Sequence, residues 1–315
     1  MKKKLFVVPA VLGTIGTFLT PYVLFKRFIG RFIIKDEMNL GKEWMPYKTE
    51  LTVKYDELKA LPHESVKIES FDKLMLHANF YKAGEQSSDK TLIVFHGFRG
   101  LAIRDFAMQY RFYMDMGYNL LIVDMRAHGE SEGRYTGFGV LDSLDCVSWC
   151  EYIECRFGKE HKVVLHGTSM GAAAVMMACG RNLPDIVKAV IEDCGFTDIE
   201  EEFKNVLGNT PVKVFFIKVA SIYSKIFAGY SFKEYKSTSA LRKAKIPVLF
   251  IHGGSDDFVP TYMVRELYES CPTDKDMLIV DGAGHTMSYV VDKQAYEAKV
   301  KSFLKKNLKN TLHFS

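Results

Sequence analysis

One serine lies in a pattern that suits nucleophilic chemistry. Ser169 is the central residue of a G-x-S-x-G motif at positions 167–171. The apolar run 162–166 predicts a buried strand before the motif, and the alanine-rich run 172–178 predicts a helix after it. A serine at such a sharp turn presents its hydroxyl above the sheet, and the helix start supplies free N–H groups for a developing oxyanion. The motif alone is weak, because a glycine-flanked turn before a core helix has the same letters.

A serine nucleophile needs a base that takes its proton and a carboxylate that orients the base. His285 follows the apolar run 277–280 on a glycine-rich loop, so we expect it at the carboxyl end of a strand, where catalytic residues are common. Asp256 and Asp257 lie on the loop that follows the apolar run 247–251. The chain order serine, carboxylate, histidine is the order of a nucleophile elbow, and it differs from the order in chymotrypsin-like and subtilisin-like proteases.

An oxyanion hole needs two N–H donors. The Met170 N–H, directly after the serine, is the first. The second is expected on the loop 96–100, which leaves the apolar run 91–95 at its carboxyl end. The Phe98 N–H is the natural donor there, since Gly97 lets the backbone approach closely. The alternative for this loop is an ordinary glycine turn.

Together these motifs resemble the serine hydrolases of the α/β-hydrolase superfamily. The stretch at 124–133 resembles the D-x-R-x-H-G-x-S-x-G loop after the fourth strand of that family. Further matches are the His-Gly-Phe turn at 96–98, the H-G-x-x-D-x-x-V-P pattern at 252–260 and Gly-Ala-Gly-His at 282–285. The matching features cover roughly residues 66–308 and stand in the family's order.

The resemblance implies roles for individual residues. The acid is the fifth letter of the H-G-x-x-D-x-x-V-P pattern, which favours Asp256 over Asp257. Some members carry the acid at a position that corresponds to Asp193, and this alternative stays open. The implied mechanism has Ser169 attack an acyl carbonyl while His285 transfers the proton, with no cofactor and no metal ion.

The composition is that of a globular protein with one large core: 48% of the 315 residues are hydrophobic and 25% are charged. Strand-like and helical runs alternate along the chain, which predicts an α/β fold with a mostly parallel central sheet and helices on both faces. The net charge is +4, and no basic patch with interleaved aromatics stands out in the catalytic part, so nucleic acid is excluded as a partner. The Cys/His spacing typical of zinc is absent from the sequence.

The N-terminus predicts a membrane anchor. Residues 5–25 carry no charge, a length that can span a bilayer core, and basic residues follow at 26, 27, 31 and 35. We therefore expect a single-pass anchor with a basic juxtamembrane segment at 1–35, and the catalytic domain at 36–315. A cleaved signal peptide or a buried core helix are the alternatives. Membrane sidedness stays open because the positive charges on the two flanks nearly balance.

About fifty residues rich in large apolar side chains separate the strand-like runs near 190 and 248. The resemblance implies a small helical cap here, at roughly 196–240, which would exclude water and shape the acyl pocket. The alternative is a helix pair that packs on the sheet as plain core.

The expected function is hydrolysis of a carboxylic acyl ester, lipid-like esters included, through an acyl-enzyme. The resemblance to serine aminopeptidases keeps hydrolysis of peptide or aminoacyl bonds as an alternative. From another class, the chain could be a catalytically silent binding or scaffold protein with the same fold.

Overall fold

The computed structural model describes residues 20–33, 38, 40–84 and 88–309. Eight strands form one sheet in the order β1-β2-β4-β3-β5-β6-β7-β8. The pairs β1–β2 and β2–β4 are antiparallel, and all other neighbours are parallel. The strands are β1 Glu64–Glu69, β2 Met75–Tyr81, β3 Lys90–Phe95, β4 Asn119–Asp124, β5 Lys162–Thr168, β6 Val187–Asp193, β7 Val248–Gly253 and β8 Lys275–Val280.

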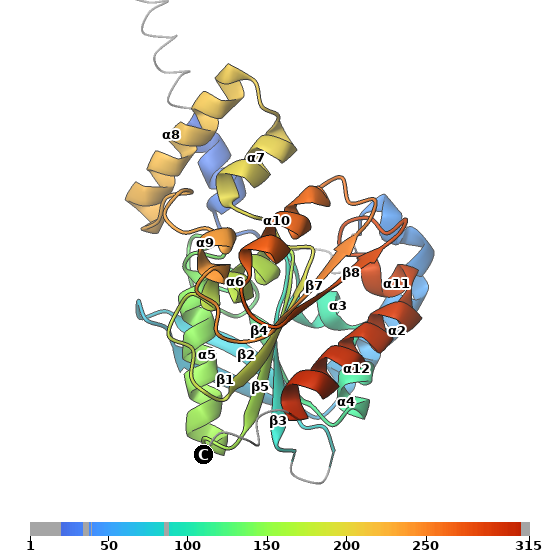
Figure 1. Ribbon diagram of the computed structural model, residues 1–315. Coiled ribbons are helices and arrows are strands. Elements are labelled where there is room, and N and C mark those ends of the chain that lie inside the picture. Colours follow the sequence, from blue (N-terminus) through green and yellow to red (C-terminus); the bar gives the residue numbers. More distant parts are fainter. Residues whose placement is uncertain (1–19, 34–37, 39, 85–87, 310–315) are drawn as a thin grey trace, which may run out of the picture.

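Helices cover both faces of this sheet (Figure 1). On one face pack α5 Asp142–Phe157, α6 Met170–Ala178, α9 Ser237–Leu241 and α10 Tyr262–Ser270. On the other face pack α2 Lys48–Ala60, α3 Ala102–Phe106, α4 Tyr110–Asp115 and α12 Lys293–Lys309. The short elements η1 Lys42–Tyr47 and α11 Ser288–Val291 precede α2 and α12. The expected fold class, a mostly parallel sheet between two helical layers, is confirmed.

The central strands are apolar on both sides because both faces of the sheet are covered. In β3, Leu92 and Val94 belong to the core under α2, α3 and α12, whereas Ile93 and Phe95 belong to the core under α5 and α6. This assignment follows from the two-residue period of a strand, which sends successive side chains to opposite faces. The motifs that the sequence predicts to be catalytic begin where such strands end, so the core fixes their positions.

Two helices stand above the sheet between β6 and α9, in the region expected for the cap. They are α7 Ile199–Leu207 and α8 Pro211–Ala228 (Figure 1). Asp198 caps α7 by accepting the Glu201 N–H, and Thr210 caps α8 by accepting the Lys213 N–H. These caps satisfy N–H groups that a helix start leaves without an internal acceptor.

The N-terminal segment packs on this cap. Residues 5–19 of the expected anchor lie outside the described residues, whereas residues 20–29 form a helix beside α7 and α8 (Figure 1). Phe25 and Ile29 are buried in the core, and the Ile29 carbonyl accepts the Thr136 N–H at 2.7 Å. The catalytic domain was expected to begin at residue 36, but these contacts make residues 20–33 part of the folded unit. In the part of the chain that the structure describes, no helix is both long and apolar enough to cross a membrane.

We expect Ile29→Ala to lower the free energy of unfolding by about 2–5 kcal/mol, because the substitution leaves a cavity in a closely packed core. Val23, an exposed residue of the same helix, provides the matched control, and Val23→Ala should change stability by less than about 0.5 kcal/mol. Urea unfolding of the two variants measures both values. Equal small effects would mean that the helix does not pack on the cap in solution.

Candidate active site

The turn between β5 and α6 holds Ser169 in a strained conformation. Its φ is +55° and its ψ −114°, a region that residues with a Cβ rarely occupy. The flanking glycines are required by crowding. A Cβ on Gly171 would overlap the Phe95 carbonyl, and a Cβ on Gly167 would overlap the Gly171 carbonyl. The turn therefore has the geometry of a nucleophile elbow.

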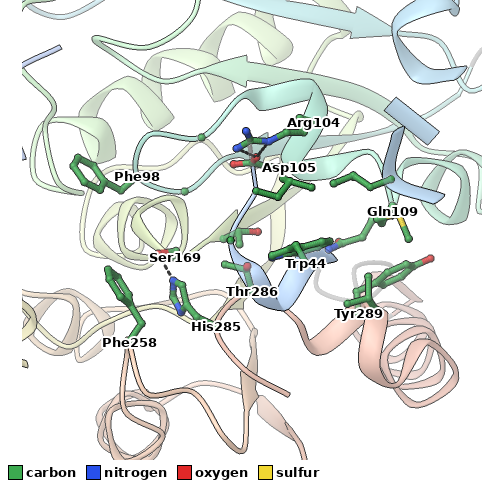
Figure 2. Close-up of a pocket in the computed structure, with 18 residues that line it drawn as sticks. Trp44, Phe98, Arg104, Asp105, Gln109, Ser169, Phe258, His285, Thr286 and Tyr289 are labelled. Carbon is green, nitrogen blue, oxygen red and sulfur yellow. Dashed lines mark hydrogen bonds and ion pairs between the residues drawn. The ribbon is translucent and has the colours of Figure 1, made fainter. Parts of the chain in front are cut away.

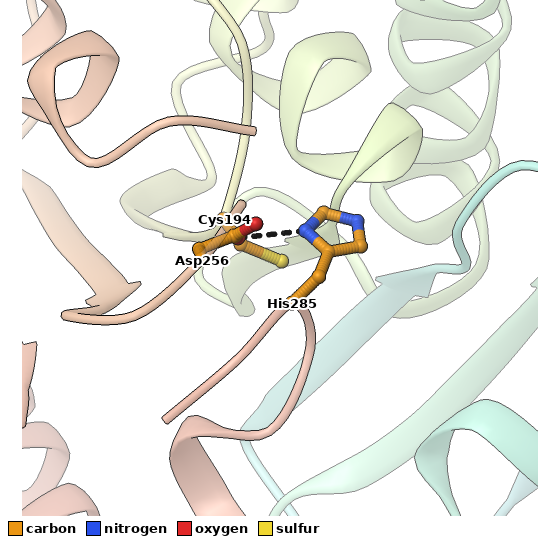
Figure 3. A group of neighbouring side chains, drawn as sticks. All are labelled: Cys194, Asp256 and His285. Atoms are coloured by element: carbon orange, nitrogen blue, oxygen red, sulfur yellow. Dashed lines mark hydrogen bonds and ion pairs between the residues drawn. The ribbon is translucent and has the colours of Figure 1, made fainter. Parts of the chain in front are cut away.

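Ser169, His285 and Asp256 form one chain of hydrogen bonds. His285 Nε2 lies 2.9 Å from Ser169 Oγ, and His285 Nδ1 lies 2.7 Å from Asp256 Oδ2 (Figures 2 and 3). With Nδ1–H donating to the carboxylate, Nε2 is left to accept the serine hydroxyl. Asp256 is fully buried, whereas the His285 side chain is partly exposed to the pocket. The structure thus brings together the three residues predicted to act as nucleophile, base and acid.

The β7–α10 loop distinguishes the two adjacent aspartates. Asp256 Oδ1 accepts the N–H groups of Phe258 at 3.0 Å and Val259 at 2.8 Å, which leaves Oδ2 for His285. Asp257 is exposed to solvent. His252 donates its Nε2–H to the Val259 carbonyl at 2.8 Å and helps to hold this loop.

Asp193, the alternative acid, is buried at the end of β6. Its Oδ2 accepts the Tyr296 hydroxyl at 3.0 Å, and its main-chain carbonyl accepts the Ser169 N–H at 2.8 Å. Burial raises the pKa of the Asp193 carboxyl to about 7. Because His285 Nδ1 is bonded to Asp256, the geometry gives Asp193 a role in supporting the elbow rather than in orienting the histidine.

We expect Asp193→Asn to keep turnover and to change the pH dependence of stability. The raised pKa means that the folded protein keeps a proton that the unfolded chain loses near pH 4. The resulting stabilisation is complete below about pH 4 and is lost as the pH rises through about 7. Asparagine is neutral throughout, so the variant should gain stability relative to the native chain across this window, by at most about 1.4 kcal/mol per pH unit. Urea unfolding at pH 4, 5.5, 7 and 8 tests this. A constant difference between the two proteins would contradict it.

The β3–α3 loop approaches the serine as the oxyanion hole requires. A Cβ on Gly97 would lie 3.5 Å from Ser169 Cβ, so the loop backbone passes close beside Ser169. Within the described part of the chain, the Phe98 N–H donates to no main-chain carbonyl. The Met170 N–H is the first of α6 and has no acceptor within the helix. Both N–H groups predicted to bind an oxyanion are therefore available beside Ser169.

Two buried histidines, whose roles the sequence did not reveal, hold this loop. His96 Nε2 accepts the Met125 N–H at 3.1 Å, and His128 Nε2 accepts the Arg99 N–H at 3.2 Å. Burial lowers the pKa of His128 to about 3, which keeps its ring neutral and able to accept. His128 belongs to the D-x-R-x-H-G stretch, so one function of that motif here is to fix the residue after Phe98.

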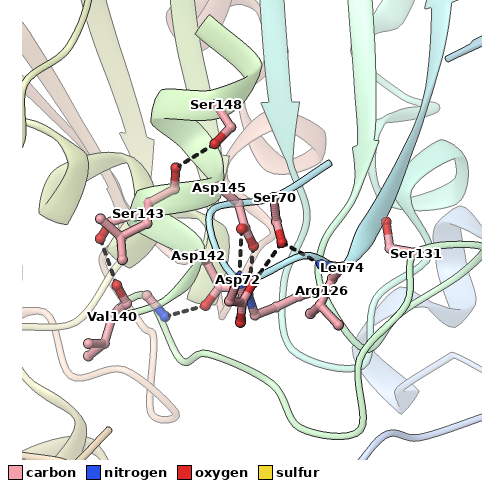
Figure 4. A network of polar contacts seen from close by, with 12 residues as sticks. Ser70, Asp72, Leu74, Arg126, Ser131, Val140, Asp142, Ser143, Asp145 and Ser148 are labelled. Carbon is pink, nitrogen blue, oxygen red and sulfur yellow. Dashed lines mark hydrogen bonds and ion pairs between the residues drawn. The ribbon is translucent and has the colours of Figure 1, made fainter. Parts of the chain in front are cut away.

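A buried network of ion pairs holds Arg126, which belongs to the same D-x-R-x-H-G stretch as His128 (Figure 4). Arg126 donates to Asp145 on α5 at 2.6 and 2.7 Å and to Asp72 in the β1–β2 turn at 2.9 and 3.1 Å. Burial opposes the charge of Arg126, but its bonds and attraction to Asp145 and Asp72 outweigh that effect and raise its pKa. Such a bidentate pair fixes orientation, so the network sets the position of the loop that carries His128.

A pocket of about 280 Å³ opens beside Ser169 and His285 (Figure 2). Apolar side chains contribute much of its wall: Leu40, Trp44, Leu51, Phe98, Met108, Phe258, Tyr289 and Val290. Polar groups of the wall include Arg104, Asp105 and Gln109, and Arg104 donates to Asp105 at 2.7 and 2.9 Å. No residue of the expected cap region 196–240 lines this pocket. Residues of the segment 40–51 line the pocket instead, and no sequence motif predicted this role for them.

The described residues contain one cluster that could ligate a metal ion: Cys194, Asp256 and His285, whose donor atoms lie within 4.8 Å of one another (Figure 3). Two of these three groups are bonded to each other in the chain that reaches Ser169. Burial also raises the pKa of the Cys194 thiol well above its usual range, whereas metal ions bind the thiolate. The donor set therefore fits proton transfer better than metal binding.

Fold and site together define an α/β-hydrolase, and comparison with known proteins gives the family. Residues 104–311 match the model of the prolyl oligopeptidase family. The chain therefore belongs to the prolyl oligopeptidase family.

Individual relatives agree with this. The chain is 27% identical over 230 residues to the uncharacterised protein YqkD of Bacillus subtilis, covering 71% of this chain and 74% of YqkD. It is 26% identical over 224 residues to the lysophosphatidylserine lipase ABHD12 of Danio rerio, covering 68% of this chain and 54% of ABHD12. The solved structure of the Pyrococcus furiosus esterase Pf2001 shares the fold, with a TM-score of 0.62, 23% identity, and coverage of 88% and 99% of the two chains. The family and these relatives support an enzyme of serine-hydrolase character.

Proposed function

We propose that this protein hydrolyses carboxylic acyl esters through a covalent acyl-enzyme. The observation that carries the proposal is the continuous hydrogen-bond chain from Asp256 through His285 to Ser169, beside a pocket. A catalytically silent protein of the same fold has no need for a strained serine at hydrogen-bond distance from a histidine oriented by a buried carboxylate.

Each group has a role in the proposed reaction. As Ser169 Oγ attacks the acyl carbonyl, His285 Nε2 takes the hydroxyl proton, and the Asp256 carboxylate stabilises the imidazolium that forms. The N–H groups of Phe98 and Met170 donate to the oxyanion of the tetrahedral intermediate. His285 then gives its proton to the leaving alcohol. A water molecule, deprotonated by the same histidine, releases the acid and restores Ser169.

The pocket supports an acyl substrate with an apolar part. Trp44, Leu51 and Met108 offer apolar surface, whereas Arg104 and Asp105 provide a polar point in the same wall. The relative named lysophosphatidylserine lipase is an enzyme that acts on a lipid ester, which favours lipid-like esters as the substrate class here.

Hydrolysis of peptide or aminoacyl bonds is the second candidate. The family match favours it, because prolyl oligopeptidase is the name of a peptidase family. The Asp105 carboxylate in the pocket wall could accept a hydrogen bond from a substrate amine, although it already accepts from Arg104. The chemistry at Ser169 would be the same, and only the leaving group would differ.

A substrate panel separates the two candidates. The purified protein is assayed with p-nitrophenyl esters of increasing acyl length, with monoacyl lipids, and with amino-acid p-nitroanilides that carry a free amine. We expect the esters to be turned over with the higher kcat/KM. A preference for the anilides would replace the ester proposal with the aminoacyl one. Absence of turnover, together with absence of labelling by a fluorophosphonate, would support the silent protein.

We also propose that the N-terminal segment attaches this enzyme to a membrane as a single-pass anchor. The support is the uncharged run 5–25, of which residues 5–19 lie outside the described residues, and the basic residues that follow it. The full-length protein is expected in the membrane fraction and to resist alkaline carbonate. Recovery in the soluble fraction, or as a form shortened after residue 25, would refute the anchor.

A further inference from the structure

Among the described residues, the outward face of α8 is apolar and exposed. The side chains of Val212, Ile222 and Ile226 are 62%, 57% and 65% exposed to solvent. These three residues, with Phe215 and Val219, recur at spacings of three and four, which places them on one side of the helix. The opposite side, with Ile217, Ala220 and Ser224, is buried against the protein. Helix α8 is thus apolar on two opposite sides, and only one of them packs against the rest of the protein.

The two margins of this stripe differ. At about 100° per residue, Lys218 and Lys225 fall along one margin, and Tyr223 and Phe227 fall along the other. On that second margin Tyr22 of the N-terminal helix contacts Tyr223 and Phe227, with ring centroids 5.7 and 6.1 Å apart. A helix with an apolar stripe and lysines at its edge is typical of a helix that lies in a membrane interface, where lysines extend to the headgroups.

The N-terminal segment extends the same apolar surface. It exposes Tyr22, Val23, Phe32 and Ile33. The last six residues of the uncharged run 5–25 belong to this segment, and the described chain begins at residue 20, beside α8 (Figure 1). A contiguous exposed surface of this kind is unusual on a soluble monomer and marks a site of interaction.

The charges of these two segments are all positive, and one of them, Lys225, pairs with Glu234 at 2.7 Å. Residues 20–33 and 211–228 contain six basic residues and no Asp or Glu: Lys26, Arg27, Arg31, Lys213, Lys218 and Lys225. A groove of about 440 Å³ beside the N-terminal helix is lined by Lys26, Arg27, Arg31 and Arg99, with Tyr22 and Phe32 among its apolar walls. These four cations form no ion pair with any described residue, and Arg31 and Arg99 donate instead to main-chain carbonyls. Such a groove suits a phosphate headgroup.

We propose that α8 and residues 20–33 dock on an anionic phospholipid bilayer, with the apolar stripe in the interface and headgroup phosphates in the basic groove. The inference builds on the proposed N-terminal anchor and adds a second contact, made by the cap. Charge favours lipid over a second copy of the chain. Pairing this face with itself would oppose cations to cations, with no carboxylate in either segment to compensate.

Tryptophan fluorescence of the full-length protein on vesicles tests the contact. Ile222→Trp places a reporter on the stripe, and Val53→Trp places one at a similarly exposed valine on α2, far from α8 (Figure 1). Each variant is mixed with phosphatidylcholine vesicles that contain 30% phosphatidylglycerol and brominated acyl chains. After subtraction of the native tryptophan signal, the emission of the stripe reporter should shift to the blue and be quenched by bromine. The α2 reporter should remain in water and unquenched.

The basic groove is tested in the same assay. Lys26→Gln with Arg27→Gln, in the Ile222→Trp background, should lower quenching on anionic vesicles to the level seen with phosphatidylcholine alone, since basic residues near an anionic surface strengthen binding to it. Far-UV circular dichroism confirms that the variants are folded. Undiminished quenching in this variant would contradict the role of the groove.

Each other outcome overturns the docking. A blue shift of the stripe reporter without bromine quenching means that protein covers the stripe, either a second copy or residues 1–19. Equal quenching of the stripe and α2 reporters means that the contact is not specific. If the protein floats with vesicles while the stripe reporter stays in water, the proposed N-terminal anchor stands and the docking of α8 is refuted. None of these readouts depends on catalysis, so their failure leaves the proposed esterase activity untouched.

Discussion

Ser169→Ala should reduce ester turnover by on the order of 10⁶. The Ser169 hydroxyl is the proposed nucleophile, and its proton is the one that His285 Nε2, 2.9 Å away, is placed to accept. The variant removes both the attacking oxygen and that proton. The residual rate should still exceed that of water alone, because the oxyanion donors Phe98 and Met170 remain. Steady-state assays with the best ester of the substrate panel measure the loss.

Covalent labelling checks the same residue independently of the substrate. A fluorophosphonate should modify the native protein at Ser169 alone, since serines without a base do not react. Ser255→Ala is the matched control, because Ser255 is an exposed serine on the loop that carries Asp256. That variant should label and turn over as the native chain does. Full labelling of Ser169→Ala would show that another residue is the nucleophile.

The sequence was sufficient to predict which three residues the structure brings together, because each lies in a short local motif at the end of an apolar strand. The parallel sheet then brings these strand ends to one edge, as open α/β sheets generally do. The choice between Asp256 and Asp257 followed from the resemblance alone. The structure gives the physical reason for this choice. Two loop N–H groups donate to the Asp256 carboxylate, whereas the Asp257 carboxylate is exposed to solvent.

The walls of the pocket could not be predicted in this way. Trp44 and Leu51 come from the segment before β1, and Arg104 and Met108 come from the helical turns after the oxyanion loop. These positions carry no motif, since any side chain of suitable size and polarity can line a pocket. What brings them together is tertiary packing over long sequence distances, which local periodicity does not encode.

The cap and the N-terminal segment show the same limit. Helical periodicity predicted helices between β6 and β7, but it cannot tell which surface a helix contacts, and this cap lines no part of the pocket beside Ser169. An uncharged run followed by basic residues indicates a membrane segment, yet the end of that run packs on α8 through Phe25. Apolar side chains suit a bilayer and a protein core equally well. Composition alone therefore does not locate the boundary between the N-terminal segment and the catalytic domain.

Asp256→Asn should reduce turnover by roughly 10⁴ while leaving substrate binding little changed. The carboxylate accepts the Nδ1–H of His285 at 2.7 Å and so fixes the tautomer that presents Nε2 to Ser169. An amide has almost the same shape but offers an N–H on one side. With Oδ1 already held by Phe258 and Val259, that N–H would face the histidine and favour the opposite tautomer. The effect should therefore fall on kcat, with KM nearly constant.

Two neighbours make the experiment decisive. Asp257→Asn alters the adjacent, exposed carboxylate and should leave turnover unchanged, since no catalytic group contacts it. Asp193→Asn alters the buried carboxyl at the end of β6 and should affect stability rather than turnover. A loss of activity in Asp257→Asn would mean that the family pattern is aligned one residue too early. A loss in Asp193→Asn, with activity kept in Asp256→Asn, would move the acid to β6 and require His285 to turn away from the carboxylate it contacts.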